Sequence, residues 1–286
     1  MKILLQITKI ELLLIARSKF TYIIAIVVAF LGIWQATSIR WNPASMWSLI
    51  GITSMEVALI LAFWTLGQGL RKQDTQVGKM VWATVSPSWA YIWGKFLGVF
   101  CVALLFSLLF ELAAIVTDQF WNVQAGLPLV HDVIFPPLGW TAFSVFWLWF
   151  MLIPVLFGVA IAICINYATH GKRLIGYATV LIYWVFGFKA YFPSWMDITS
   201  VSMFQNNDPS KEIFRSVSAV WERYYLAHVT PLLQATQIMD MVRAEIPPYF
   251  LGWPFLVNRV FFLLLSLLLV WVTVFVVDRR RSATGG

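Results

Sequence analysis

The chain has 286 residues and a formal net charge of +7, and 60% of its residues are hydrophobic while only 12% are charged. A soluble domain carries about a quarter charged residues, so the composition excludes an ordinary soluble domain and places most of the chain in lipid. The positive charges flank apolar stretches instead of forming a long tract. This pattern favours membrane topology over nucleic-acid binding.

The first 19 residues predict a helix that lies along the inner membrane surface. Ile3, Ile7, Ile10 and Leu14 recur at helical spacing, and polar residues such as Lys9 fall largely on the other side. An amphipathic pattern of this kind is typical of interfacial helices.

Six apolar stretches follow, and each predicts a membrane-spanning helix. A bilayer core of about 30 Å needs roughly 20 apolar residues in a helix, and a helix satisfies its own backbone hydrogen bonds in lipid. We therefore expect an all-α integral membrane protein in which residues 1–286 form a single transmembrane domain. The expected spans are about 20–38, 48–66, 96–117, 138–165, 174–192 and 260–277.

The basic residues predict the orientation of these spans. Lysine and arginine are enriched in cytoplasmic loops, and here they gather on the side that holds both termini. The two short loops on the other side hold only Arg40. We therefore expect a multi-pass protein of the cell membrane with both termini in the cytoplasm. The residues on the basic side are Lys2, Lys9, Arg17, Lys19, Arg71, Lys72, Lys79, Lys95, Lys172, Arg173, Arg279, Arg280 and Arg281.

Two connecting segments are too long to be simple turns. The predicted cytoplasmic loop at 67–95 is polar at first and then carries Val77, Met80 and Val81 at helical spacing. Such a helix either docks on a soluble partner or lies on the inner leaflet, and the pattern leaves both interpretations open. The predicted external segment at 193–255 contains two proline-initiated helix starts, which predict short helices at about 209–228 and 231–244.

Two carboxylates fall inside predicted spans. Glu56 lies near the middle of the second span and Glu111 in the outer part of the third. A charge at the bilayer centre costs about 2.5–3.5 kcal/mol on insertion scales, so such groups face a protein interior or a wet cavity. They either line a substrate path or make a hydrogen bond between helices. Gly94 and Gly98 form a G-x-x-x-G pattern that allows close approach of another helix.

The sequence contains no G-x-x-x-x-G-K-[ST] phosphate loop and no paired-cysteine or histidine motif for a metal. We therefore expect no catalytic residues, no cofactor and no metal on this chain.

The layout resembles the permease subunits of type-2 ABC transporters. That family has an amphipathic helix, six spans, a coupling helix between the second and third spans, and short external helices between the fifth and sixth. Its loop motif is similar to Asp74, Gly78, Pro87, Gly94 and Lys95 here, although Asp74 stands where Glu is usual and Lys79 where Thr is usual.

The resemblance implies a mechanism and a set of partners. Residues of about 72–86 would form a coupling helix seated on a separate ATPase subunit, with contacts from Asp74, Val77, Gly78, Met80, Val81 and Pro87. Two permease copies, identical or related, would pair with two ATPases that hold ATP and Mg. Their motion would move a hydrophobic or amphipathic substrate (a peptide, antibiotic, lipid or glycan) outward across a prokaryotic plasma membrane.

Two other functions compete with this interpretation. An ion-gradient-driven secondary transporter or channel would use Glu56 and Glu111 to bind cations or relay protons. A membrane enzyme or an assembly scaffold acting on lipid would need a polar cluster at one membrane face, and the sequence shows none.

Overall fold

A computed structural model describes residues 2–41, 46–73, 87–125, 147, 151–169, 172–188 and 253–284. Within these ranges the chain forms seven α-helices and no β-strand. The protein is therefore all-α over the part that can be described. The helices are α1 (Lys2–Ala16), α2 (Lys19–Trp41), α3 (Met46–Gln73), α5 (Ser88–Ala125), α7 (Leu152–Ala168), α8 (Arg173–Phe188) and α12 (Trp253–Thr284).

Three helices are long and apolar enough to cross a membrane, through Lys19–Thr37, Ser88–Thr117 and Leu256–Ser282. A fourth, Leu152–Ala168, is apolar but shorter. Each of the six apolar stretches overlaps one described helix, which is α2, α3, α5, α7, α8 or α12 in chain order. The fourth and fifth stretches lie partly outside the described residues. The two helices expected between 209 and 244 lie outside the described residues.

The helices extend beyond the bounds that hydropathy alone suggests. α3 continues to Gln73, and α5 begins at Ser88, eight residues before the expected start at 96. The backbone N–H of Tyr91 donates to the carbonyl of Pro87 at 3.2 Å, so Pro87 sits where the first helical hydrogen bond is accepted. The connection between α3 and α5 is therefore shorter than the 67–95 segment that the polarity of the sequence predicts.

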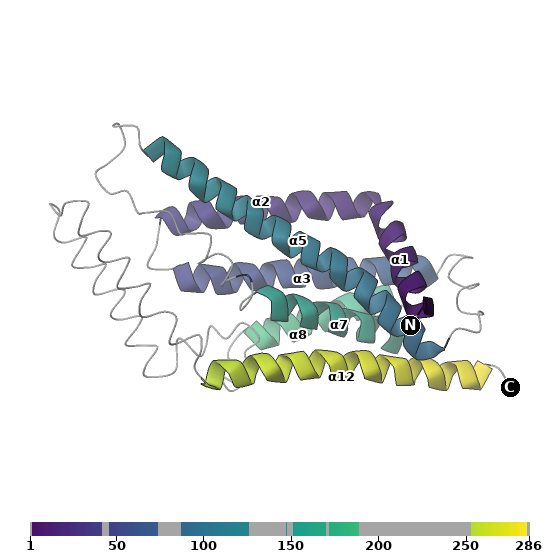
Figure 1. Ribbon diagram of the computed structural model, residues 1–286. Helices are drawn as coiled ribbons and strands as arrows, with labels where there is room; N and C mark the ends of the chain where they lie inside the picture. The colour runs from purple at the N-terminus through teal and green to yellow at the C-terminus, as the bar shows by residue number, and fades with distance from the viewer. Residues whose placement is uncertain are drawn as a thin grey trace.

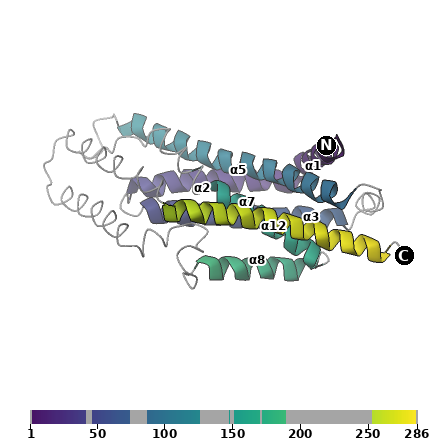
Figure 2. The ribbon, with the colours of Figure 1, turned by 60° about the horizontal axis from the view of Figure 1, so that its bottom comes forward.

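Six helices run lengthwise and α1 crosses one end of them (Figure 1). α1 and the C-terminal part of α12 lie at that same end, as the second view confirms (Figure 2). The turn between α1 and α2 is fixed by side chains, because the hydroxyl of Thr21 donates to the carbonyl of Ile15 at 2.9 Å and that of Tyr22 to the carbonyl of Ala16 at 2.9 Å. We call the end that holds α1 the basal end.

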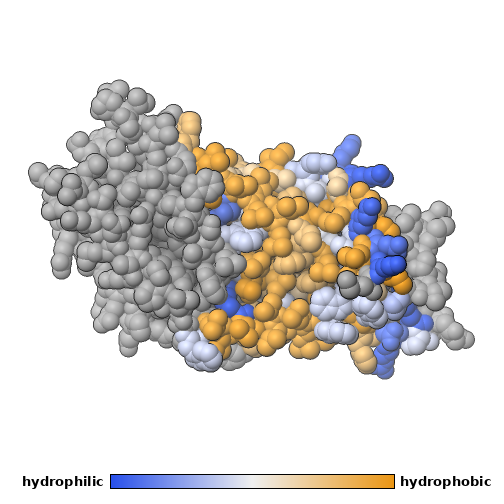
Figure 3. Space-filling view, in the orientation of Figure 1, coloured by the Kyte–Doolittle hydropathy of each residue, from blue (hydrophilic) through white to orange (hydrophobic). Residues whose placement is uncertain are grey.

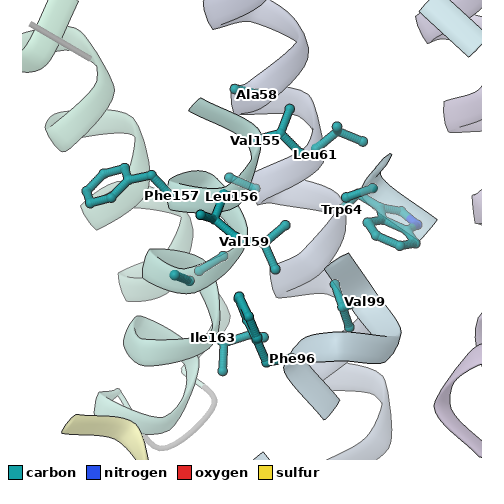
Figure 4. Close-up of a cluster of buried hydrophobic side chains, with 14 of the residues drawn as sticks. Ala58, Leu61, Trp64, Phe96, Val99, Val155, Leu156, Phe157, Val159 and Ile163 are labelled. Atoms are coloured by element: carbon teal, nitrogen blue, oxygen red, sulfur yellow. The ribbon is translucent and has the colours of Figure 1, made fainter. Parts of the chain in front are cut away.

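A core of aliphatic and aromatic side chains holds α3, α5 and α7 together (Figure 4). Trp64 of α3 packs edge-on against Phe106 of α5, with ring centroids 5.3 Å apart. Phe157 of α7 makes a similar contact with Phe262 of α12 at 5.4 Å. The labelled core residues are Ala58, Leu61, Trp64, Phe96, Val99, Val155, Leu156, Phe157, Val159 and Ile163.

A broad apolar surface surrounds this core, and hydrophilic side chains gather towards the basal end (Figure 3). Monomeric soluble proteins rarely expose apolar patches of this extent. The surface is therefore suited to lipid. Among its most exposed members are Tyr22, Ile26, Phe30, Leu105, Val116, Leu264 and Phe275.

Glycine lets two helix pairs approach closely. A Cβ atom at Gly32 of α2 would lie 2.3 Å from the backbone oxygen of Phe110 in α5. At Gly94 and Gly98 it would lie 2.9 Å from Ile7 and 2.7 Å from Glu11, both in α1. The close approach predicted from the G-x-x-x-G pattern is confirmed, and the helix that approaches is α1.

Candidate functional site

Most of the residues expected to contact an ATPase lie outside the described residues. This holds for Asp74, Val77, Gly78, Met80 and Val81. Pro87 is described; it is exposed and stands directly before α5. The structure therefore defines the two ends of the 74–86 segment, at Gln73 and Pro87.

The first turn of α5 is tied to the last part of α12. The hydroxyl of Ser88 donates to a carboxylate oxygen of Asp278 at 3.0 Å. A carboxylate near a helix N-terminus also interacts favourably with the helix dipole. Ser88, which follows Pro87, is thus held by a residue of α12 that lies 190 positions later in the sequence.

Two turns after Ser88 along α5, a lysine is buried between two tyrosines. Lys95 is 3% exposed, and its Nζ donates to the hydroxyl of Tyr167 in α7 at 3.3 Å. Tyr167 in turn donates to the hydroxyl of Tyr91 at 3.3 Å. The Nζ atom lies 5.8 Å from the ring centre of Tyr91 and 5.4 Å from that of Tyr167, within cation–π range.

Two arginines of α12 complete this arrangement. The guanidinium of Arg281 lies 5.5 Å from the ring centre of Tyr91. Arg280 donates to the backbone carbonyls of Tyr167 and, at 3.4 Å, of Ala168. These carbonyls end α7, where a helix has unsatisfied acceptors and a negative dipole end. We call Tyr91, Lys95, Tyr167, Arg280 and Arg281 the basal cluster.

α1 is the fourth helix at this site. Thr8 donates to the carbonyl of Gly94 at 3.2 Å as well as to its own helix at Leu4. The buried carboxylate of Glu11 interacts favourably with the ammonium of Lys95. The opposite surface of α1 is mixed, because it exposes Leu5, Ile10 and Leu13 together with Lys2, Gln6 and Lys9. Ile7, a member of the expected apolar stripe, packs at Gly94 of α5.

The basal cluster joins α5, α7 and α12 side chain to side chain, with α1 packed on α5 beside it. A displacement at the start of α5 would therefore be transmitted to several helices at once. Sequence analysis missed the two tyrosines, because nothing in a single sequence shows that positions 72 or 76 apart meet. The one available signal was the helical spacing of Tyr91 and Lys95, which puts them on one face.

The two carboxylates inside predicted spans lie in different surroundings. Glu56 of α3 is half-buried, and Glu111 of α5 is 8% exposed. Among the described residues, no hydrogen bond or ion pair joins them. In the part of the chain that the structure describes, Oε1 of Glu111 is buried without a hydrogen-bond partner.

The described residues contain no group of three or more His, Cys, Asp or Glu side chains that could hold a metal ion. Cys101 and Cys164 are both free thiols, the first exposed and the second half-buried. No protein-family model matches the chain, and no curated protein matches it. Any functional assignment therefore rests on the sequence pattern and on the geometry above.

Proposed function

We propose that this chain is the membrane-spanning permease subunit of a type-2 ABC exporter. The observation that carries the proposal is the connection of the 74–86 segment to the bundle. The segment leaves α3 at Gln73 and returns at Pro87, and the next residues of α5 lead directly into the basal cluster. A soluble partner that moved this segment would move α5 together with α7 and α12.

The proposal includes the topology expected from the sequence. Six spans would be formed, in chain order, by α2, by α3, by α5, by the 138–165 stretch to which α7 belongs, by α8 and by α12. α1 would lie on the inner membrane surface. α1 and the C-terminal part of α12 lie together at the basal end (Figures 1 and 2), and they carry Lys2, Lys9, Arg279, Arg280 and Arg281. These basic residues support placing that end in the cytoplasm. Both termini and the 74–86 segment then face the same compartment.

The exporter would work with separate nucleotide-binding chains. Two copies of this permease, or this chain and a related one, would pair with two ATPase subunits that bind ATP and Mg. Asp74, Val77, Gly78, Met80, Val81 and Pro87 would form the contact with the ATPase. Closure of the ATPases would displace the basal ends of the two bundles and move a hydrophobic or amphipathic substrate outward.

The buried carboxyl of Glu111 favours a second candidate, an ion-gradient-driven transporter or channel. That function would need Glu56 and Glu111 to exchange protons or cations, and it would proceed without an ATPase. It gives no role to the 74–86 segment or to its connection with the basal cluster.

Capture of the partner separates these functions. We would purify the tagged chain from membranes of its own host and compare it with a variant carrying Val77→Asp, Met80→Asp and Val81→Asp. We expect a P-loop ATPase to accompany the unaltered chain in comparable amount and to be lost from the variant. A control that places three aspartates at Thr284, Gly285 and Gly286 adds the same charge away from the segment and should retain the ATPase.

The result that contradicts the proposal is a monodisperse, active transporter from which an ATPase is reproducibly absent. If the Val77, Met80 and Val81 variant captured as much ATPase as the unaltered chain, the exporter proposal would be retained. These residues would then be rejected as the contact with the ATPase.

A further inference from the structure

The carboxyl of Glu111 is the strongest unexplained feature inside the bundle. It lies in the middle of an apolar helix, is 8% exposed, and has Oε1 buried with no hydrogen-bond partner among the described residues. Burying a polar group without a hydrogen-bond partner is unfavourable, and burying a charged group costs more. A group that only stabilised the fold would be expected to have found a partner.

The face of α5 that carries Glu111 also carries a serine that binds an indole. Ser107 lies one helical turn before Glu111 on the same face, and it accepts a hydrogen bond at 3.1 Å from the indole N–H of Trp147. The indole of Trp147 is therefore held about one helical turn from the acid, on the same face of α5.

The position of Glu111 along the membrane fits an outward path. It follows Lys95 of the basal cluster by 16 residues, which is about 24 Å along a helix. α5 and α12 lie together at the basal end and separate towards the other end of α5 in both ribbon views (Figures 1 and 2). The C-terminal part of α5 therefore lies apart from α12.

We propose that Glu111 is a subsite for the cationic group of an amphipathic substrate, with the indole of Trp147 about one helical turn away. A carboxylate and aromatic faces are the groups that bind an organic cation in an apolar setting. The substrate would supply a charge and contacts to the carboxyl of Glu111, whose Oε1 has no hydrogen-bond partner among the described residues. The inference rests on the proposed export function and narrows the substrate class to hydrophobic cations.

Two hydrophobic ions of nearly equal size and opposite charge test this inference. We would measure binding of tetraphenylphosphonium and of tetraphenylborate to the purified full chain by equilibrium dialysis, subtracting empty detergent micelles. The unaltered chain is expected to bind the phosphonium at least tenfold more tightly than the borate. If the unaltered chain bound the two ions with equal affinity, that result alone would overturn the proposal.

Variants then locate the charge. Glu111→Gln keeps the shape of the side chain and is expected to weaken phosphonium binding at least tenfold, while Glu111→Asp keeps the charge and should stay within about threefold. Leu112→Ala, at an exposed position on the outer side of α5, should leave binding unchanged. Unaltered phosphonium binding by a monodisperse Glu111→Gln chain would overturn the assignment.

The outcomes separate this inference from the exporter itself. Phosphonium binding that depends on Glu111, in a chain that never captures an ATPase, would keep the subsite and reject the exporter. Capture of an ATPase by a chain that shows no preference for the cation would keep the exporter and reject the subsite.

Discussion

The same chemical change, glycine to alanine, should have opposite effects at two positions of this fold. At Gly32 the added Cβ would lie 2.3 Å from the backbone oxygen of Phe110 and 3.1 Å from Cβ of Ala113. A backbone atom cannot rotate away, so α2 and α5 would have to separate by about 1 Å to restore ordinary contact. At Gly176 the nearest atom, Cδ2 of Leu66, would be 3.5 Å away, which is ordinary contact.

The magnitudes follow from these distances. Forced overpacking costs about 1–3 kcal/mol, while replacing glycine inside a helix gains up to about 1 kcal/mol. Gly32→Ala should therefore lose about 1–2 kcal/mol of stability, and Gly176→Ala should gain up to about 1 kcal/mol. At roughly 2–4 °C per kcal/mol, we expect Tm to fall by about 2–8 °C in the first variant and to stay or rise by up to about 4 °C in the second.

Tryptophan fluorescence during a thermal ramp suits this comparison, because the chain has 16 tryptophans. Both variants and the unaltered chain would be measured in one detergent at one scan rate. The reasoning is refuted if Gly32→Ala is as stable as the unaltered chain, or if the two variants shift Tm in the same direction.

Two further predictions concern the basal cluster and the apolar surface. Tyr167→Phe removes the hydroxyl that contacts both Lys95 and Tyr91, so it should lower the free energy of unfolding by about 1–3 kcal/mol. Tyr22→Phe loses one exposed hydrogen bond and should lower it by less than about 1 kcal/mol. Equal thermal stability of the two variants would contradict the role given to Tyr167. Cys101 is exposed on a helix suited to lipid, and Cys164 is half-buried. A charged, membrane-impermeant maleimide should therefore modify neither cysteine in opened native membranes and both after denaturation in SDS. Labelling of Cys101 in the native membrane would show that this face of α5 is in contact with water.

Hydropathy and periodicity predicted the helices because lipid-compatible stretches must be both long and apolar. They failed at the start of α5, where Lys95 and the preceding Trp89 and Trp93 made residues 88–95 resemble a loop. In the structure this lysine is buried on two tyrosine rings, so a charged residue continues the helix instead of ending it. Local sequence does not show that such a charge has aromatic partners.

The candidate site was predictable only in its local parts. The spacing of Gly94 and Gly98 predicted a close helix contact, but it did not identify α1 as the helix that packs there. The bond between Ser88 and Asp278 joins residues 190 apart, and Arg280 reaches α7 across 113 positions. Contacts of this kind depend on how the helices are arranged, and that information is absent from any single segment.

A cross-linking measurement tests the central claim most directly. In a chain with Cys101→Ser and Cys164→Ala, a single Met80→Cys would be treated in intact cells with a membrane-permeant thiol-to-amine cross-linker. Our account predicts one major adduct that contains a P-loop ATPase and disappears when Met80 is left unaltered. Labelling of the same cysteine from outside the cell, or the absence of any protein adduct at this position, would contradict it.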